Sequence, residues 1–574
     1  GITAASMGLM ISDIPFDGPV IGAKMVKEED AWVINPAFSI ADNKSEVNLA
    51  GKDSEVVMLE GYLDELTEED FLSGIEKASP FMEKVSNFQR EVAQEVGKEK
   101  LKAPEVTDFL TEDEKNTIKR IVNDNFNTIY EKSDKKGKYG VINEIKKLVE
   151  EAVELDEQAE NYLKKKNQMK AAGDDEMKKL MRKRILEENK RIDNRESEQI
   201  RPLSMEVGIL PRAHGSAVFT RGETQALVTT TLGTSRDEQI IDDIGGDDRK
   251  SFMLHYNFPP FCVGEVGWYR STSRREQGHG HLAESSFYNV LPKDEDFPYT
   301  IRVVSEIMES NGSSSMATIC GGTLSMMDAA VGIKSPVSGI AMGLIKDGER
   351  YKVLSDILGN EDHWGDMDLK VAGTYEGITA IQMDLKIQGI SKEVFSNALK
   401  QAKKGRIHIL DAMTKVIEQP REKLSDYAPK IERVEIPEGK IGAIIGSGGS
   451  TIKALQEETN TTISVDDDGV VKIFGVNIKE VQNAIDYVKL LAYGPKKGSE
   501  YTGPVVRIEN YGVFVELAPG IKGLMHKSNF AQRNKNPFHL FKKGQEIHVK
   551  VKNYDKRGGK IDLMEMRDDQ QKND

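Results

Sequence analysis

The chain has 574 residues, a formal net charge of −15 at pH 7 and 38% hydrophobic residues, and its mean hydropathy is −0.48. This length exceeds what one hydrophobic core can organise, so we expect about four domains of a soluble protein. No run of about 18 apolar residues occurs, so we expect neither a membrane span nor a membrane partner. The two cysteines, Cys262 and Cys320, are too few for a disulfide framework and favour a reducing compartment.

The start of the chain predicts an incomplete first domain. Gly1 stands in place of a methionine and lies inside an apolar segment, so we expect a fragment that begins in mid-domain. A targeting peptide would lie upstream of such a fragment. The absence of such a peptide here proves nothing. We expect a cytoplasmic protein of bacterial origin, and the missing start leaves an organellar location open.

An internal repeat follows. Residues Gly18–Val26 resemble Ser335–Leu344. Further on, Glu46–Gly51 align with Asp368–Gly373 at a spacing of 322 residues. A shared ancestral unit explains this pattern, and a piece about as long as residues 190–330 would be missing before the first copy. Each copy continues into a strand-like run and an amphipathic helix, expected at Glu68–Lys77 and Lys392–Lys404.

Residues 83–190 separate the two copies and are rich in Glu, Lys, Asn and Leu. Apolar residues recur there at helical spacing, as in Val141, Ile142, Ile145, Leu148 and Val149. This pattern predicts an all-helical linker domain. From Arg191 onward β-branched residues predict strands, at Ala217–Thr220 and Gln225–Leu232. Turn-forming residues predict two later boundaries, at Pro429 to Pro437 and at Gly494–Gly498.

The acidic segment of the second copy is the strongest chemical signal. It contains Glu361, Asp362, Asp366 and Asp368, followed by Lys370. Charged and apolar residues alternate over residues 366–371, which predicts a strand with two unlike faces and places Asp368 beside Lys370. Carboxylates beside a lysine can hold a hard divalent ion and stabilise charge on a phosphate. The alternative is a solvated acidic loop that feeds an edge strand.

The first copy serves as a control. It has Glu46 and Asn48 where the second copy has Asp368 and Lys370, and its counterpart of Asp362 is Ile40. The loss of the lysine and of one carboxylate fits one active site and one structural duplicate. The charged residues of a solvated face could, however, change in the same way.

Two further segments of the second copy are suited to phosphate. Residues Asn311–Met316 end a strand-like run and precede a helix expected at Ala317–Ala330, where backbone N–H groups and the hydroxyls of Ser314 and Ser315 can bind an oxyanion. A plain helix cap is the alternative.

An arginine pair lies earlier in the second copy, in an expected glycine-bearing loop. Arg274 and Arg275 can bind phosphate, or they can be surface residues. His279 and His281 could ligate a metal, but no cysteine lies close to them in the sequence.

Residues Ile441–Ile452 predict a KH module. A short apolar helix there runs into a Gly-x-x-Gly loop formed by Gly446, Ser447, Gly448 and Gly449. A loop without bulky side chains lets a nucleic-acid backbone approach closely. Strands are expected to follow at Thr462–Val465 and Val470–Phe474. A nucleotide-phosphate loop is disfavoured because the Gly-Lys-Ser/Thr ending is absent.

The last segment predicts a basic β-barrel. Residues 496–560 contain 14 Lys and Arg against 5 Asp and Glu, a balance of 14 − 5 = +9. Tyr511, Phe514 and His526 could stack on single-stranded RNA, and core packing is the alternative for Phe514. Four strands are expected, at Gly503–Ile508, Gly512–Leu517, Ile547–Val551 and Lys560–Met564.

The order of these parts resembles the polynucleotide phosphorylase family over nearly the whole chain. The motifs that carry the resemblance are Ser313–Met316, Arg274–Gly280 and Glu361–Lys370. It implies an α+β fold of duplicated ribonuclease-PH-type cores, the first one incomplete, with an all-α linker domain, a KH domain and a small OB-fold barrel. The expected divisions are residues 1–82, 83–190, 191–428, 429–493 and 494–574.

The resemblance also implies roles. Asp362 and Asp368 would bind Mg²⁺, with Mn²⁺ as a substitute, and Lys370 would be the catalytic lysine. Ser314 and Ser315 would bind phosphate, with Arg274 and Arg275 nearby. The implied partners are single-stranded RNA, inorganic phosphate, nucleoside diphosphates, two further copies in a homotrimeric ring, and other RNA-degradation proteins.

Two departures from the family stand out. Asn360 replaces an acid that the family often has, and the opening half of the first core, with a channel-lining arginine loop, is missing. The expected activity is phosphorolytic 3′→5′ degradation of RNA to nucleoside diphosphates, reversible as polymerisation. A hydrolytic metal-dependent exoribonuclease and a non-catalytic RNA-binding scaffold are the alternatives.

Overall fold

The structure is a computed structural model that describes residues 1–37, 45–103, 107–153, 155–156, 158–243, 246–268, 271–466, 468–532, 535–555 and 559–566. It contains two compact units, one of residues 1–232 with 237–425 and one of residues 233–236 with 426–574. Within the described ranges, no helix has the length and apolar character needed to cross a membrane. Ile40, the counterpart of Asp362 in the repeat, lies outside the described residues.

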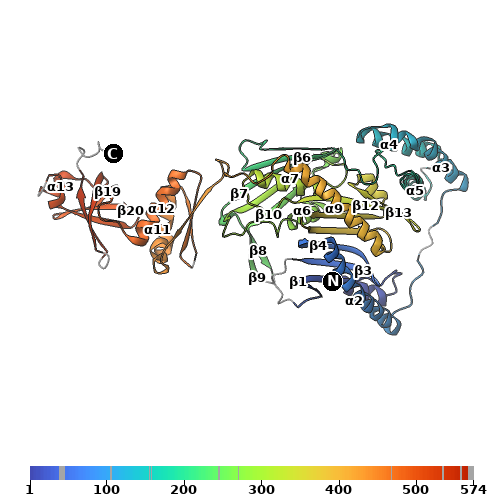
Figure 1. The fold of residues 1–574 in the computed structure, drawn as a ribbon, viewed down its shortest axis with the longest axis horizontal. Coiled ribbons are helices and arrows are strands. Elements are labelled where there is room, and N and C mark those ends of the chain that lie inside the picture. Colours follow the sequence, from blue (N-terminus) through green and yellow to red (C-terminus); the bar gives the residue numbers. More distant parts are fainter. Residues whose placement is uncertain are drawn as a thin grey trace. The chain divides into compact units, whose positions relative to one another are not determined.

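An eight-stranded antiparallel sheet joins the two copies of the repeat in the first unit (Figure 1). Its order is β13-β12-β14-β15-β4-β3-β1-β2, so each copy supplies four strands and the copies meet at β15 and β4. This mirrored order confirms the predicted duplication. The first copy contains β1 (Ile21–Glu28), β2 (Ala31–Ile34), β3 (Glu46–Lys52) and β4 (Glu55–Leu66). The second contains β12 (Ser338–Asp347), β13 (Arg350–Ser355), β14 (Met367–Gly373) and β15 (Ile378–Leu385).

A helix follows each set of four strands, at the residues where the sequence predicts one. These are α2 (Glu68–Val96) and α9 (Lys392–Thr414), whose first N–H groups are capped by the side chains of Thr67 and Ser391. Both helices are longer than expected because their buried faces continue, to Gln89 in one and Met413 in the other. A short helix, α1 (Ile2–Ile11), precedes β1.

A second sheet of five strands belongs to the second copy. Its order is β10-β11-β7-β6-β5; β10 and β11 pair parallel, whereas β5, β6 and β7 pair antiparallel. The strands are β5 (Leu203–Val207), β6 (Gly215–Arg221), β7 (Thr224–Gly233), β10 (Phe252–Asn257) and β11 (Thr300–Glu309). A hairpin of β8 (Gln239–Asp243) and β9 (Gly246–Lys250) stands apart from both sheets.

Helix α7 (Ser314–Asp328) is central because it contacts β6 and β11 of one sheet and β12 and β14 of the other. Its residues 314–327 are all buried, as expected for a helix that is apolar on every side. Helix α6 (Arg274–Ser285) packs beside it, against β10 and β15.

The predicted loop at Arg274–His281 is wrong, because this segment forms the first two turns of α6. Ser273 and Glu276 form a capping box there, which offsets the low helix propensity of the two glycines in the segment.

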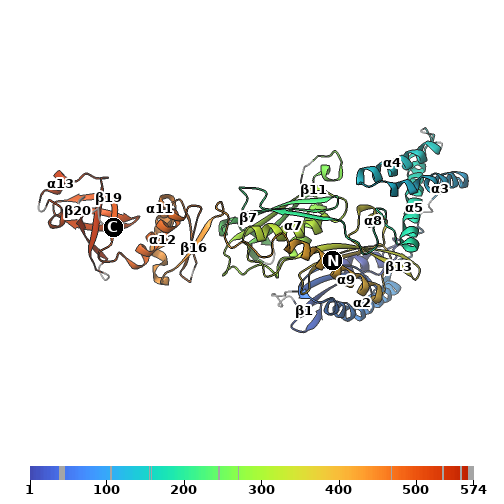
Figure 2. The same ribbon diagram turned by 45° about the horizontal axis from the view of Figure 1, so that its top comes forward.

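The helices between the copies are α3 (Glu112–Phe126), α4 (Lys135–Ala152) and α5 (Tyr162–Glu188), which pack on one another (Figure 2). As predicted from the spacing, the apolar face of α4 is buried, at Val141, Ile142, Ile145 and Val149.

The second unit contains two small folds. One is a three-stranded sheet, β16 (Lys430–Glu435), β18 (Val470–Gly475) and β17 (Thr462–Val465), with helices α10 (Ile441–Ile445), α11 (Ser450–Thr459) and α12 (Ile478–Tyr493). The other is a closed barrel of order β19-β20-β21-β23-β22. Its strands are β19 (Glu500–Glu509), β20 (Gly512–Ala518), β21 (Ile521–His526), β22 (Glu546–Asp555) and β23 (Lys560–Glu565), with a short helix α13 (Pro537–Leu540). The sequence analysis missed β21.

Candidate active site

The first unit contains a cavity of about 1130 Å³. Its lining comes from α4, α6, β14, the short 3₁₀ helix η3 (Pro260–Val263), the loop 310–313 after β11, and α8 (Gly359–Trp364). Four residues predicted from sequence line it together: Arg275, Asp362, Asp368 and Lys370. They are brought together from segments almost 100 residues apart, so the cavity is the candidate site.

The loop before α7 leaves polar atoms unpaired. Gly312 has a φ of 95° and Ser313 a φ of 51°, and a Cβ on Gly312 would lie 2.4 Å from the carbonyl oxygen of Ile357. Ser313 precedes the first turn of α7, yet its side chain makes no capping hydrogen bond. The buried Oγ atoms of Ser313 and Ser315 have no hydrogen-bond partner among the described residues. A ligand at this loop would account for both unpartnered hydroxyls, whereas a plain helix cap would not.

Ser314 differs from its neighbours because its hydroxyl is engaged. Its Oγ lies 2.6 Å from the hydroxyl of Tyr256. Of the predicted pair, therefore, only Ser315 has an unpartnered hydroxyl, and both serines are buried behind the cavity lining rather than part of it. Ser313, which lines the cavity, was not singled out from the sequence because three consecutive serines give no sign of which one faces a ligand.

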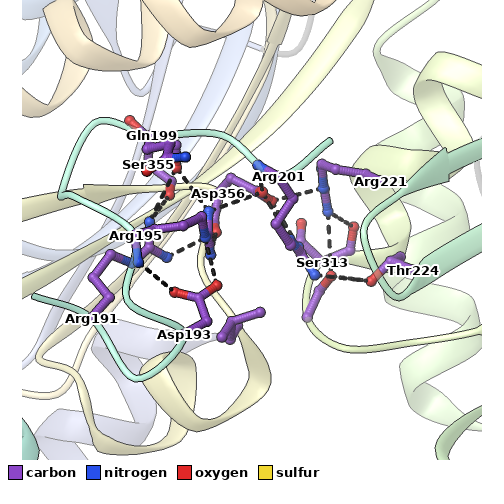
Figure 3. A network of polar contacts seen from close by, with 12 residues as sticks. Arg191, Asp193, Arg195, Gln199, Arg201, Arg221, Thr224, Ser313, Ser355 and Asp356 are labelled. Atoms are coloured by element: carbon purple, nitrogen blue, oxygen red, sulfur yellow. Dashed lines mark hydrogen bonds and ion pairs between the residues drawn. The ribbon is translucent and has the colours of Figure 1, made fainter. Parts of the chain in front are cut away.

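An arginine network holds this loop from outside the cavity (Figure 3). Arg201 Nη1 donates to the carbonyl oxygen of Asn311 at 2.8 Å, and Arg221 Nη2 donates to that of Ser313 at 3.0 Å. The carbonyl of Gly312 accepts from Arg221 as well. These bonds engage carbonyl oxygens that would otherwise repel an anion bound at the loop.

Asp356 is bound by these arginines in turn. Its Oδ1 pairs with Arg201 Nη2 and with Arg221 Nε, each at 2.7 Å, and its Oδ2 lies 3.3 Å from Arg195 Nη1. Burial alone would raise the pKa of Asp356, but Arg201 and Arg221 outweigh it and hold that pKa well below its usual range. Asp356 therefore stays ionised, and the network remains intact across the working pH range.

Two carboxylates of the acidic segment have structural partners. Glu361 is fully buried and accepts from Arg191 Nε at 2.7 Å. Asp366 is also buried and pairs with Arg182 Nη1 at 2.8 Å. Neither lines the cavity, so both fix the ends of α8 and β14 rather than face a ligand.

The other acidic residues and the lysine face the cavity. Asp368 and Lys370 lie on one face of β14, as predicted, with 3.0 Å between Lys370 Nζ and Asp368 Oδ2. Lys370 also donates to Gln382 Oε1 at 2.9 Å. Asp362 comes from α8, is half-exposed, and lies 3.3 Å from Lys386 Nζ.

The charge balance around Asp368 is unfavourable to its ionised form. Burial raises the pKa of Asp368; Lys370 lowers it, while the negative charges of Asp362 and Asp384 raise it again. The net direction is upward, which indicates a buried carboxylate short of positive charge. Asp384 faces Asp368 across the β14–β15 pairing and was missed in the sequence because strand register is not visible there.

The donor set fits a hard divalent ion. Mg²⁺ is typically held by one or two carboxylates together with waters and substrate phosphates, and Asp362 and Asp368 provide such a pair in the cavity. No group of three or more His, Cys, Asp or Glu side chains suited to a metal occurs in the described ranges. An ion bound here would therefore share its coordination with substrate.

The two arginines of α6 have different surroundings. Arg275 lines the cavity, and its guanidinium lies 4.3 Å from the ring centroid of Phe258. Arg274 is exposed and is not part of the lining. Only Arg275 is thus placed to touch a ligand in the cavity.

The two histidines of α6 also differ. His279 lines the cavity with Nδ1 3.2 Å from the Tyr256 hydroxyl, whereas His281 is exposed outside it. Burial and then the charges of Lys370 and Arg275 lower the pKa of His279 to about 3. His279 is therefore neutral at working pH. Neither histidine belongs to a metal-binding group among the described residues.

In the second unit, the Gly-x-x-Gly loop joins α10 to α11. Gly446, Gly448 and Gly449 have φ values of 73°, 59° and 79°, which favour glycine. Ser447 and Gly448 are exposed, and the space where a Cβ of Gly448 would point is open. The loop thus presents bare backbone to solvent.

Of the predicted aromatic residues of the barrel, Phe514 and His526 lie on the β20–β21 hairpin and Tyr511 lies in the turn between β19 and β20. His526 pairs with Gly512, two residues before Phe514 on the same face of β20. Tyr511 is 44% exposed. Phe514 is half-buried and carries Arg507 at 5.7 Å from its ring centroid, and the barrel core is formed by other residues. Surface placement therefore agrees better with stacking than with core packing.

Comparison with known protein families covers most of the chain. Residues 199–332 match the 3′ exoribonuclease family, domain 1, and residues 89–196 match the RNA binding domain of polyribonucleotide nucleotidyltransferase. Residues 431–490 match the KH domain and residues 494–564 the S1 RNA binding domain.

Curated relatives named polyribonucleotide nucleotidyltransferase match along nearly the whole chain. The protein from Treponema denticola is 46% identical over 568 residues, covering 97% of this chain and 80% of the relative. That from Sorangium cellulosum is 44% identical over 566 residues, covering 98% and 74%. The Chlorobaculum parvum protein is 44% identical over 575 residues, covering 96% and 77%.

Proposed function

Since the chain belongs to the polyribonucleotide nucleotidyltransferase family, we propose a role for each residue of the cavity in that family's reaction. The protein is a metal-dependent phosphorolytic 3′→5′ exoribonuclease that acts on RNA with inorganic phosphate. The observation that carries the assignment to this cavity is the unpartnered Ser313 hydroxyl in the same pocket as the Asp368–Lys370 pair.

Phosphate binds at the start of α7 in this proposal. The hydroxyls of Ser315 and Ser313 donate to it, and the N–H groups of the first helical turn add their partial positive charge. Ser314 contributes through its backbone, because its hydroxyl is held by Tyr256. Arg275 neutralises part of the phosphate charge, and the exposed Arg274 guides RNA toward the cavity.

The reaction needs no protein nucleophile. An oxygen of the bound phosphate attacks the phosphorus of the last phosphodiester, while the 3′-oxygen of the preceding nucleotide leaves and takes up a proton. The products are a nucleoside 5′-diphosphate and an RNA shorter by one nucleotide. Lys370 stabilises negative charge that develops on the attacked phosphate. Run in reverse, the same step adds nucleotides from nucleoside diphosphates to RNA.

Asp362 and Asp368 are proposed to hold Mg²⁺, for which Mn²⁺ can substitute. When bound, the ion withdraws charge from the attacked phosphate. The raised pKa of Asp368 supports this role, because a cation next to it would supply the positive charge that the buried carboxylate lacks.

We propose that the other segments bring RNA to this cavity. The loop of Gly446, Ser447, Gly448 and Gly449 contacts the RNA backbone, and Tyr511, Phe514 and His526 stack on bases. The proposed division is residues 1–82 and 191–428 for the two cores, 83–190 for the helical domain, 429–493 for the KH domain and 494–574 for the barrel and tail. The family matches at 89–196, 431–490 and 494–564 support it.

The proposed assembly is a ring-shaped homotrimer that also meets other RNA-degradation proteins. The bacterial relatives support a cytoplasmic location. Sedimentation equilibrium would give three times the 64.0 kDa chain mass for this assembly, and a monomer at micromolar concentration would contradict it.

Product analysis tests the function directly. Poly(A) incubated with the protein, phosphate and Mg²⁺ should yield ADP, and omission of phosphate should stop release. AMP formed without phosphate would indicate a hydrolytic nuclease instead, and RNA binding without any release would indicate a scaffold.

A further inference from the structure

The proposed roles leave one wall of the catalytic cavity unexplained. Helix α4 of the helical segment supplies Lys135, Lys136, Tyr139 and Asn143 to the same lining as Asp368 and Lys370. The family description of residues 89–196 mentions RNA binding but assigns no residue and no position relative to the cavity. The helix is therefore a candidate part of the substrate site.

Lys135 fastens α4 to the loop of residues 310–313, and Tyr139 lies close to α8. The backbone N–H of Lys135 donates to Glu223 Oε1 and its Nζ to the carbonyl oxygen of Ser310, each at 2.6 Å. Glu223 in turn accepts from Asn311 Nδ2 at 3.0 Å. The Tyr139 hydroxyl lies 3.6 Å from the position of a Cβ on Gly359, the first residue of α8. The hydrogen bonds of Lys135 and Glu223 therefore hold the start of α4 at the loop of residues 310–313, called the serine loop below, and Tyr139 lies near the helix of Asp362.

Lys136 is placed differently from the other two lysines of the cavity, Lys135 and Lys370. Lys135 binds Ser310 and Lys370 binds Asp368. The Lys136 side chain is exposed and forms no ion pair or hydrogen bond within the described ranges, and Arg275 shares this property. An unpaired lysine that lines a cavity and stands on an anchored helix turn is positioned for an anionic ligand.

The chemistry of the substrate identifies that ligand. Phosphate at the serine loop and the cleaved phosphodiester at Asp368 and Lys370 occupy the catalytic residues, and the next phosphodiester of the strand still needs a cation. We propose that Lys136 binds a phosphodiester of the RNA upstream of the cleaved bond, so that α4 forms part of the RNA path inside the active site. This inference rests on the proposed roles of the cavity residues.

The test compares Lys136→Gln with Lys147→Gln. Lys147 lies on the same helix, 74% exposed, and pairs only with Glu151 at 3.6 Å in the described structure. A short oligoadenylate is the substrate, so that the KH and barrel modules contribute little. We expect kcat/KM for Lys136→Gln to fall about tenfold at low salt through KM for RNA, with kcat and KM for phosphate unchanged. The salt slope of log(kcat/KM) should shrink by about 0.7.

Lys136→Arg should restore both the KM and the salt slope, and Lys147→Gln should match the wild type. An unchanged KM and slope in Lys136→Gln would overturn the proposal. A raised KM for phosphate, with KM for RNA unchanged, would also overturn it by placing Lys136 at the phosphate. A failure of the proposed roles of the cavity residues would be recognised separately, because Asp368→Asn would then keep its activity whatever the Lys136 variants do.

Discussion

The two copies of the repeat contain the same kind of charge pair in different surroundings. In the second copy, Asp368 and Lys370 share strand β14, with side chains 15% and 11% exposed. In the first copy, Glu46 on β3 pairs with Lys24 of the neighbouring strand β1 at 2.6 Å, with side chains 21% and 44% exposed. The position of Lys370 is taken by Asn48 there.

The contrast extends to the opposite strand. Asp368 faces Asp384 on β15, whereas Glu46 faces Tyr62 on β4, whose ring packs edge-on against Tyr288 at 5.6 Å. Burying a charge pair is costly, and such a pair is retained where function requires it. The exposed pair of the first copy contributes little to stability. Burial and a second carboxylate, rather than the presence of an acid and a lysine, therefore distinguish the copy that we propose to be active.

The test with the largest expected effect replaces each of the two matched acids, Asp368 and Glu46, by its amide. Asp368→Asn should lower phosphorolysis about 10³-fold, because the ion site and the charge on the attacked phosphate are both affected. Glu46→Gln should leave the rate unchanged. Release of ADP from poly(A) measures the rate, and gel-shift assays should show RNA binding retained in both variants. Equal losses in the two variants would remove the distinction between the copies.

The lysines provide the second test. Lys370→Gln should lower kcat about 10²-fold, since one preorganised donor to the transition state is lost. Lys24→Gln breaks an exposed pair and should change neither kcat nor the melting temperature measurably. Steady-state kinetics at saturating RNA and phosphate separate the two. A full rate in Lys370→Gln would show that the same-strand pair is structural.

Adjacent serines sharpen the comparison within the active copy. Ser315→Ala should raise KM for phosphate about tenfold, because its unpartnered hydroxyl is lost to the ligand, without a stability penalty. Ser314→Ala should instead cost about 1 kcal/mol of stability by leaving the Tyr256 hydroxyl unpaired. Phosphate titration and urea unfolding measure the two effects. The reverse assignment, with KM raised only in Ser314→Ala, would place the ligand on the other hydroxyl.

The smallest expected effect on activity concerns its dependence on pH. The folded pKa of His279, about 3, lies below the usual value near 6.5. Its contribution to stability is therefore present above about pH 6.5 and is lost as pH falls toward 3, where the unfolded state binds the proton first. Unfolding of His279→Gln should show a shallower loss of stability over that interval. Activity of the wild type should show no titration of this residue between pH 5 and 8, and an inflection removed by His279→Gln would contradict its neutral state.

The sequence alone predicted what local periodicity determines. Alternation along residues 366–371 placed Asp368 and Lys370 on one face, and the repeat identified the two cores. The bounds of the two KH strands were predicted to within one residue, because clear turns flank these short strands. These features depend on neighbours in the chain, so they are visible without a structure.

Long-range partners could not be predicted. Nothing local separates Glu361 and Asp366 from Asp362. The burial of Glu361 depends on Arg191, 170 residues earlier, and that of Asp366 on Arg182, 184 residues earlier. Asp384 required the register of β15, and Ser313 required the backbone conformation at Gly312. The loop expected at Arg274 was a different error. The Ser273–Glu276 capping box is a helix-start pattern that can be read from sequence, whereas the two glycines nearby favour a loop.

The continuous eight-stranded sheet gives the first copy a protective role. Strand β15 hydrogen-bonds to β4 along residues 378–384, so its outer edge is covered by the copy that has lost the lysine. Without β4, that edge would present unpaired N–H and C=O groups and buried apolar residues such as Ile381 and Met383, which favours edge-to-edge aggregation. Selection against aggregation can therefore preserve a duplicate after its chemistry has gone.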